Sequence, residues 1–401
     1  MRTDLSAHLG PIKWNLVPLW SVASRVDKKN VGMTERNLLS LSYGQVIRKD
    51  IDAIGGLRPE SYETYNVVEQ GDVVLRMTDL QNDQRSIRTG LTSERGLITS
   101  AYITLRPDPH KVEPRFFAAV LRAYDIQKTY YRMGAGVRPN LGYPEFTDIP
   151  VPIPDLATQQ RIADNLERET GEIDTMIAKL DELAGKLEER RRRSIDTAFE
   201  SVSETTPLWM LTDGVIDCPH TTPDLDETGP AEAVRTASIR GGKYLPGNGI
   251  RVSKETHAQR NGAFQPRPGD IFFTREAPAG EAALVPDGLF CLGQRMVLLR
   301  INSEMVDSRF LLYALYTNAV QQDFLLSAGG STVVNLKLGT IRSTQIPAVT
   351  RDEQERIADH LDEVTSRIDT MLAKVAELKS LLVERRAALI TDVVTGRKEV
   401  A

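Results

Sequence analysis

Apolar residues recur every seven positions along two long segments, residues 156–201 and 351–401, with charged residues between them. This spacing is typical of a helix that buries a narrow apolar seam against a partner helix. A second apolar line accompanies it, with Met176 and Leu183 in the first segment and Ile357, Val364, Met371 and Leu378 in the second. The main line contains Leu166, Ile173, Leu180 and Leu187, then Leu361, Ile368, Val375 and Leu382. The pattern predicts two helices of about 45 residues, each about 65 Å long.

The two helical segments are copies of one another. At a constant offset of 195 residues, Gln159–Arg191 and Gln354–Arg386 are identical at 19 of 33 positions. Extended, proline-containing stretches precede both segments, and Asp155 and Thr350 stand where an N-cap is expected. Each helix has one seam to cover, and the other copy is the nearest partner. We therefore predict an antiparallel coiled coil.

The duplication includes the segment that precedes each helix. Shared landmarks appear in the same order in both halves: Leu19-Trp20 and Leu208-Trp209, Gly71-Asp72 and Gly269-Asp270, Asn140-Leu141 and Asn335-Leu336. Between these landmarks the halves share little. An internal repeat of this kind predicts two related domains with different contents. The expected organisation is a pseudo-two-fold repeat: domain one at 1–155, helix one at 156–201, domain two at 202–350 and helix two at 351–401.

The segments before the helices read as mixed α and β. "DVVLRM", "LITSAYITL", "DIFFTRE" and "MVLLRI" are short β-rich runs, whereas "PRFFAAVLRAYDIQKTYY" and "SRFLLYALYTNAVQQDFLL" have helical spacing. The predicted fold class is α+β: two mixed domains separated by the pair of long helices.

Composition adds few restrictions. The chain has 401 residues and a net charge of −5, whereas nucleic-acid-binding proteins are more often basic. Residues 1–155 nevertheless carry 20 Lys and Arg against 18 Asp and Glu, a net +2. Cys218 and Cys291 do not suggest a disulfide framework. With no signal peptide or membrane-spanning run in the sequence, we expect a cytoplasmic protein.

No pattern in the chain indicates catalysis. We find no phosphate-binding glycine loop, no methyltransferase motif and no histidine or cysteine spacing suited to a metal ion. The sequence therefore predicts neither a catalytic residue nor a metal ligand.

The order of these features resembles the specificity subunit of type I restriction–modification systems. The matching pieces are "VPIPDLATQQRIADNL" with "RRRRSIDTAFES", and "TQIPAVTRDEQERIADHL" with "ERRAALITDVVTG". The stretches "GDVVLRMTDLQND" and "GDIFFTREAPAGEAALV" also resemble recurrent recognition domains. The resemblance implies two target recognition domains that each read one half of a split double-stranded DNA site.

The resemblance also implies partners. Two modification subunits would dock on the helices and methylate adenine, and separate restriction subunits would cleave. This chain would bind no cofactor, because S-adenosylmethionine, Mg²⁺ and ATP would lie on the partner subunits. Two other classes stay open: a coiled-coil protein scaffold that reads no DNA, and a DNA methyltransferase whose motif has drifted. Binding of S-adenosylmethionine by the chain alone would indicate the enzyme.

Candidate DNA-binding residues are basic, polar or aromatic side chains on loops, because such groups contact phosphates and base edges. Tyr130 and Tyr131 are better explained by packing, Arg275 could instead pair with Glu276, and Arg190–Arg193 are better explained by structure or docking than by DNA contact. The candidates are Tyr43, Arg48, Lys49, Arg76, Arg132, Arg138 and Asn140 in domain one, and His220, Thr221, Arg240, Lys243, Arg275 and Arg295 in domain two.

Overall fold

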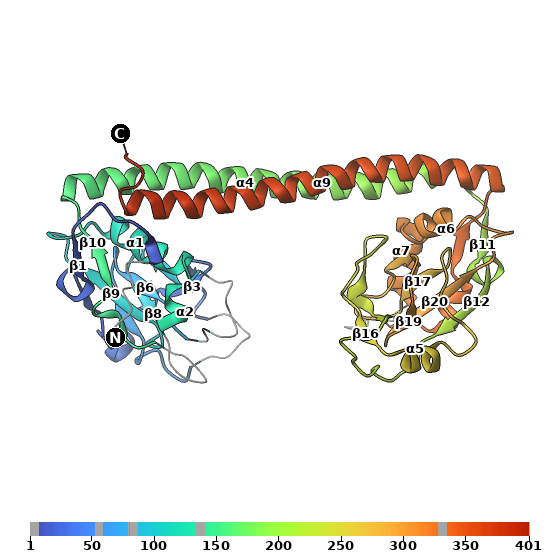
Figure 1. Ribbon diagram of the computed structural model, residues 1–401, viewed down its shortest axis with the longest axis horizontal. Helices are drawn as coiled ribbons and strands as arrows, with labels where there is room; N and C mark the ends of the chain where they lie inside the picture. The colour runs from blue at the N-terminus through green and yellow to red at the C-terminus, as the bar shows by residue number, and fades with distance from the viewer. Residues whose placement is uncertain are drawn as a thin grey trace. The chain divides into compact units, whose positions relative to one another are not determined.

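The computed structural model describes residues 8–52, 59–78, 80, 87–133, 141–327 and 335–400. These form two compact units, here called unit 1 (1–180 with 377–401) and unit 2 (181–376). Each unit contains a mixed α/β head and part of each long helix (Figure 1). The long helices are α4 (Leu156–Phe199) and α9 (Arg351–Val394), each of 44 residues, so the two predicted helices are confirmed.

Two four-stranded sheets form the head of unit 1, in the orders β2-β9-β6-β7 and β4-β3-β8-β5. A separate pair, β1 and β10, leads into α4. The elements are β1 (Leu16–Pro18), η2 (Leu19–Ser21), β2 (Ala23–Arg25), η3 (Val31–Met33), β3 (Leu38–Ser42), β4 (Gln45–Lys49), β5 (Asn66–Val68), β6 (Val73–Leu75), β7 (Thr89–Leu91), β8 (Gly96–Ile98), β9 (Ile103–Pro107), α1 (Pro114–Ile126), α2 (Thr129–Met133), α3 (Tyr143–Phe146) and β10 (Pro150–Pro152).

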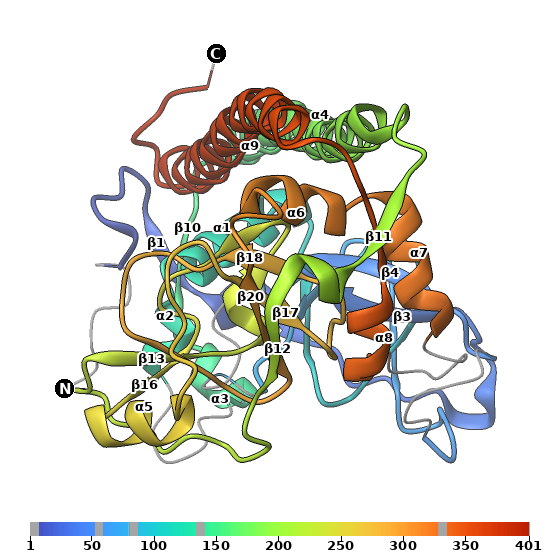
Figure 2. The same cartoon turned by 90° about the vertical axis from the view of Figure 1, so that its right-hand side faces the viewer.

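The head of unit 2 is built on the sheet β12-β20-β17-β18, whose strands lie side by side in Figure 2. A second sheet has the order β16-β13-β19, and β11 pairs with β21 before α9 begins. The elements are β11 (Thr205–Pro207), η4 (Leu208–Leu211), β12 (Thr212–Asp217), β13 (Ala231–Val234), η5 (Thr236–Ser238), β14 (Ile239–Arg240), β15 (Lys243–Tyr244), β16 (Ile250–Val252), α5 (Lys254–Asn261), β17 (Ile271–Thr274), β18 (Ala282–Leu284), β19 (Phe290–Leu292), β20 (Met296–Ile301), α6 (Ser308–Leu315), α7 (Asn318–Ser327), α8 (Leu338–Ser343) and β21 (Gln345–Pro347).

The β-rich runs predicted from sequence contain strands, but each predicted head helix is two helices. In unit 1 the helical run divides between α1 and α2 because Lys128 has a positive φ of 58°, which a continuing right-handed helix excludes. In unit 2 the run divides between α6 and α7 at Tyr316. The start of α1 is as the sequence favours: Pro114 is its first residue, and the Glu113 carboxylate accepts from Phe116 N–H at 2.6 Å.

Both long helices contribute to the core of the head beside them. In unit 1, Ile162 and Leu166 of α4 pack in one cluster with Phe116 and Phe117 of α1, and with Ile390 of α9. The corresponding cluster of unit 2 contains Phe199 of α4, Leu361 of α9 and Phe310 of α6. Each head therefore completes its core with residues from two distant parts of the chain.

The main apolar line on the long helices is buried, but the second line is not. Leu166, Ile173 and Leu187 are buried, as are Leu361, Ile368 and Val375, and Leu180 and Leu382 are half-buried. The central members of the second line are exposed to solvent in this chain by itself. Those members are exposed by 44–50%: Met176, Leu183, Met371 and Leu378.

A glutamine at the first turn ties each long helix to its own head. Gln159 accepts from the backbone N–H of Glu113 at 2.8 Å and donates to the carbonyl of Pro154 at 2.8 Å. Gln354 accepts from Asp307 N–H at 2.8 Å and donates to the carbonyl of Val349 at 3.1 Å. Both side chains are buried, so the repeated glutamine has a structural role in each unit.

An arginine on a head helix also ties each long helix to its own head. Arg115 of α1 contacts Glu113, Asp164 and Glu167, all at 2.8 Å, and Arg309 of α6 contacts the corresponding acids of unit 2, Asp307, Asp359 and Asp362, at 2.7–3.3 Å. The hydrogen-bonded carboxylates raise the pKa of both guanidinium groups, with Glu113 the largest cause for Arg115 and Asp359 for Arg309. Among the described residues, no helix is both long and apolar enough to cross a membrane.

Candidate nucleic-acid interface

Four of the candidates in unit 2 meet at one edge of its main sheet. Strands β12 and β17 both run antiparallel to the central β20, so both end where β20 begins. The register pairs Asp217 with Val297 and Thr274 with Met296 at this edge. His220 and Thr221 follow β12, Arg275 follows β17, and Arg295 precedes β20. We call Asp217, His220, Arg275, Glu276 and Arg295 the strand-end cluster.

Arg275 is held by an acid that the sequence did not indicate. Its Nη1 lies 2.9 Å and 2.8 Å from the two carboxylate oxygens of Asp217, and its side chain is only 15% exposed. The predicted alternative, a pair with Glu276, is wrong, because Glu276 faces Arg295 at 3.6 Å. Arg275 therefore joins the end of β12 to the end of β17.

Arg295 is the more accessible arginine of the strand-end cluster. Its side chain is 53% exposed, and its backbone has a positive φ of 67°. Its carbonyl accepts from Arg275 N–H at 3.0 Å, which holds this unusual turn in place. A fixed backbone with an exposed guanidinium at its tip is suited to donate to a phosphate or to a guanine edge.

His220 and Thr221 complete this edge of the sheet. His220 Nε2 lies 3.4 Å from the Asp217 carboxylate, and the His220 carbonyl accepts from Gln294 at 3.1 Å. The Thr221 hydroxyl accepts from Arg260 at 3.3 Å. Both side chains are exposed beside Arg295 and could contact DNA together with it.

Arg240 and Lys243 lie on a separate hairpin that contacts the long helices. Arg240 Nη1 is 3.7 Å from a Glu281 oxygen, and Lys243 forms an ion pair with Asp369 of α9. Glycines at 241 and 242, with φ of 58° and 84°, form the two-residue turn between β14 and β15. The structure therefore gives Lys243 a protein partner, and its predicted contact with DNA stays a prediction.

The candidates in unit 1 are spread over several elements. Tyr43 is 77% exposed at the tip of the β3–β4 hairpin, where Tyr43 and Gly44 have φ of 46° and 79°. Arg48 of β4 donates through Nε to Glu94 at 2.7 Å, and Lys49 beside it is exposed. The carbonyl of Gly44 accepts a hydrogen bond from Arg122 of α1, so α1 holds the turn that contains Tyr43.

Of the remaining unit 1 candidates, Arg76 is bonded to a buried arginine, Arg88. Arg88 is fully buried and donates to the carbonyls of Arg76 at 3.1 Å and Thr78 at 2.7 Å. Arg76 is half-buried, and Arg132 is exposed on α2. The predicted packing of Tyr130 is confirmed, because its ring is fully buried and its hydroxyl donates to the Leu121 carbonyl at 2.7 Å. Arg138 and Asn140 lie outside the described residues.

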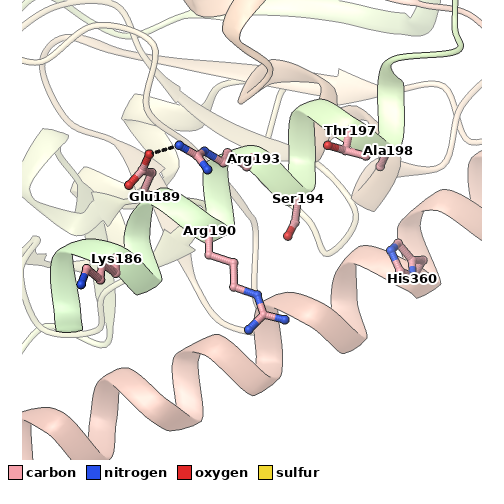
Figure 3. A pocket seen from close by; sticks show the side chains of 8 residues that line it. All are labelled: Lys186, Glu189, Arg190, Arg193, Ser194, Thr197, Ala198 and His360. Atoms are coloured by element: carbon pink, nitrogen blue, oxygen red, sulfur yellow. Dashed lines mark hydrogen bonds and ion pairs between the residues drawn. The ribbon is translucent and has the colours of Figure 1, made fainter.

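The run of arginines at 190–193 lies partly in an open groove of unit 2. The groove, of about 690 Å³, is shown in Figure 3. Arg193 pairs with Glu189, whereas Arg190 extends toward α9. The lining is mostly basic and polar: Lys186, Glu189, Arg190, Arg193, Ser194, Thr197, Ala198 and His360. Such a surface suits an acidic partner segment better than a small apolar ligand.

Two ion pairs between the long helices were not predicted from the sequence, although their residues are identical in the two copies of the repeat. Asp174 of α4 pairs with Arg386 of α9 at 3.1 Å in unit 1, and Arg191 of α4 pairs with Asp369 of α9 in unit 2. At the offset of 195, Asp174 corresponds to Asp369 and Arg191 to Arg386. Each aspartate therefore pairs with the arginine of the other copy. Among the described residues, no group of three His, Cys, Asp or Glu is placed to hold a metal ion.

Comparison with known proteins agrees with this architecture. Residues 226–380 match the family described as "Type I restriction modification DNA specificity domain". The chain is 28% identical over 108 residues to the type I restriction enzyme EcoBI specificity subunit of Escherichia coli, over 26% of this chain and 22% of that protein. The aligned stretch thus spans about a fifth of that relative.

One solved structure has the same fold over nearly the whole chain. A chain from a structure concerned with complex assembly and conformational transition of the type I R-M system has a TM-score of 0.67 at 17% identity, covering 95% of this chain and 97% of that one. The HsdS subunit of Thermoanaerobacter tengcongensis gives 0.48 at 16% identity, covering 96% and 97%. The first of these likenesses shows that the two heads and long helices form a known architecture.

Residues 226–380 are thus similar to the DNA specificity domain of type I restriction–modification proteins. The relative that the chain matches is a specificity subunit of a type I restriction enzyme, so the chain is similar to this class of protein over the aligned residues.

Proposed function

We propose that this chain is the DNA-reading subunit of a type I restriction–modification complex. The head of unit 1 reads one half of a split double-stranded DNA site, and the head of unit 2 reads the other. The observation that carries the proposal is the match of residues 226–380 to a DNA specificity domain, since this stretch contains Arg275, Glu276 and Arg295 of the strand-end cluster.

The long helices would serve as the spacer between the two heads. We propose that α4 and α9 form an antiparallel coiled coil with an approximate two-fold relation. Two contacts within unit 1 support the direction. Asp174 lies 3.1 Å from Arg386 of α9, and Glu169, which comes earlier in α4, lies 3.5 Å from Lys398, which follows the end of α9. The matching Asp–Arg, Gln and Arg contacts of the two units support the two-fold relation.

The helices would also dock the catalytic partners. The exposed apolar line, with Met176, Leu183, Met371 and Leu378, and the basic groove of Figure 3 are surfaces on which two modification subunits could bind. Those subunits would bring S-adenosylmethionine and methylate adenine, and restriction subunits with Mg²⁺ and ATP would cleave. The specificity chain itself is proposed to be non-catalytic and to act in the cytoplasm.

The decisive experiment maps methylated adenines by long-read sequencing in cells with and without this chain, in the presence of its modification partner. We expect a split site whose two half-sites differ, because the two heads differ in sequence. A continuous or palindromic site would contradict the proposal. Purified chain alone should not bind S-adenosylmethionine, and binding would favour a drifted methyltransferase. No DNA binding even with the modification partner present would favour a protein scaffold.

A further inference from the structure

In both units a hairpin turn of the head is hydrogen-bonded to a residue at or just after a head helix, and the two residues occupy corresponding positions in the repeat. In unit 2 this is the β14–β15 turn, where Gly242 N–H donates to the Tyr316 hydroxyl at 2.8 Å. In unit 1 it is the β3–β4 turn, whose Gly44 carbonyl accepts from Arg122 of α1. Arg122 and Tyr316 correspond in the repeat, because each follows its N-cap acid, Glu113 or Asp307, by nine residues.

The hairpin turn of unit 2 is also bonded to both long helices. Asp369 of α9 pairs with Arg191 of α4 and with Lys243 at the start of β15. Arg191 also donates to the Gly241 carbonyl at 3.3 Å. One carboxylate and one guanidinium therefore join three parts of the chain. Gly241 N–H donates to Glu281 at 2.7 Å, which fixes the other side of the turn.

In unit 1 the hairpin turn is bonded to Arg122 of α1, and among the described residues the corresponding Asp–Arg pair of the long helices forms no hydrogen bond or ion pair with the turn. The Asp174–Arg386 pair joins α4 and α9, and both of its members act electrostatically on Arg122. Burial, and then the charge of Arg386, lower the pKa of Arg122. Arg122 also donates to the Thr89 carbonyl at 2.7 Å. The helix residues are identical in the two copies, whereas the turn residues, Tyr43-Gly44 and Gly241-Gly242, differ.

We infer that Asp369 and Arg191 are positioning residues that form a socket for the hairpin turn of the unit 2 head. The socket fixes the angle and height of this head against the helix pair, so it determines which gap between half-sites is accepted. This inference rests on the proposed function for its effect on DNA, but not for the socket itself.

The charges in the socket of unit 2 are suited to this role. The Arg191 side chain is 14% exposed and that of Asp369 is 27% exposed, so water competes weakly for them. Removing one member of a shielded pair leaves the other charge without its partner, which is costlier than loss of an exposed pair. Lys243 is 49% exposed, so its removal should loosen the hairpin without disturbing the Arg191–Asp369 pair.

The test uses the full chain with its modification partner and compares Asp369→Asn with the control Glu363→Gln. Glu363 lies on the same helix in an exposed i,i+4 pair with Arg367, so the control also removes one carboxylate. We expect methylation at gaps one base pair longer or shorter to rise roughly tenfold relative to the correct gap in Asp369→Asn, with half-sites unchanged. Gap selectivity like that of the wild type would overturn the inference.

A second measurement needs no DNA. Amide hydrogen exchange at Gly241 and Gly242 should be roughly tenfold faster in Asp369→Asn and Lys243→Met than in the wild type and the control. Equal exchange would overturn the socket. If Asp369→Asn unfolds the chain, the exchange of Lys243→Met decides whether the socket exists. A wild type that yields no split methylation pattern refutes the proposed function instead, and the exchange result still decides whether the socket exists.

Discussion

Arg275 and Arg295 lie at the same sheet edge, yet their side chains are held differently. Arg295→Ala should relax one base position of the unit 2 half-site by about 1–3 kcal/mol, because an exposed arginine at a fixed turn can bond a guanine edge. Methylation mapping of the variant checks this. If Arg295 contacts a phosphate instead, all sequences weaken alike and the salt dependence of binding falls.

Arg275→Ala should act on stability. It leaves the Asp217 carboxylate without its main cation, and the shielded geometry predicts a loss of about 1–3 kcal/mol in the free energy of unfolding. Urea denaturation measures this loss. The control is Arg295→Ala, which should change the free energy of unfolding by less than about 0.5 kcal/mol, as exposed sites do. A reversed order of the two variants would contradict these assignments.

Among the elements, α4 contains two glycines that weaken it without a packing reason. A Cβ added at Gly171 or Gly185 would meet nothing within 4 Å. Gly185→Ala should therefore raise the free energy of unfolding by roughly 0.5–1 kcal/mol, because alanine loses less backbone entropy in a helix. Gly171→Ala should behave alike. Thermal unfolding measures both, and a destabilised Gly185→Ala would mean that this face of α4 is covered.

The spacer role of the long helices can be tested by lengthening both together. Four residues inserted after Leu183 and four after Leu378 lie between the two Asp–Arg pairs and preserve both. The insertion adds about 6 Å of rise and a net rotation of about 40°. One base pair adds about 3.4 Å and about 35°. We expect the gap in the methylated site to lengthen by one or two base pairs.

Both half-sites should stay unchanged in the lengthened chain. A matching insertion in α4 alone serves as the control, because it shifts Arg191 away from Asp369 and should reduce methylation. An unchanged gap in the active double insertion would show that α4 and α9 do not set the distance.

For the molecule as a whole, the heads are expected to act independently. Replacing residues 202–350 with another recognition domain should change one half-site and leave the other intact. The separate cores of the two units supply the physical reason. Methylation mapping measures the outcome, and a change in both halves would contradict independent reading. The replacement must carry a hairpin turn that fits the socket.

The long helices could be predicted because their signals are local. The seven-residue period identifies them, and the carboxylate of Asp155 caps α4 by accepting from Thr158 N–H at 2.9 Å, as its position predicted. The exposed second line could not be foreseen, since a period shows that two apolar lines exist but not which one a neighbour covers.

The site was less predictable because its contacts join distant residues. Asp217 and Arg275 are 58 residues apart, and no pattern in the sequence links them. Lys243 was expected to contact DNA on its charge and its glycine turn, but the turn brings it to Asp369 on α9. The identical Asp174 and Asp369, with Arg191 and Arg386, were visible in the repeat. Only the antiparallel contacts reveal that each pairs with the other copy.

Unit 1 is built from two segments that are far apart in the sequence, and this affects how it folds during synthesis on the ribosome. Its core includes Leu389, Ile390 and Val393, and Lys13 N–H donates to the Thr395 carbonyl at 2.8 Å. The first head to emerge therefore waits for the end of the chain, while residues 181–376 are translated in about 10–40 s. During that time its surface for α9 is uncovered, so unit 2 can mature before the unit whose synthesis began first.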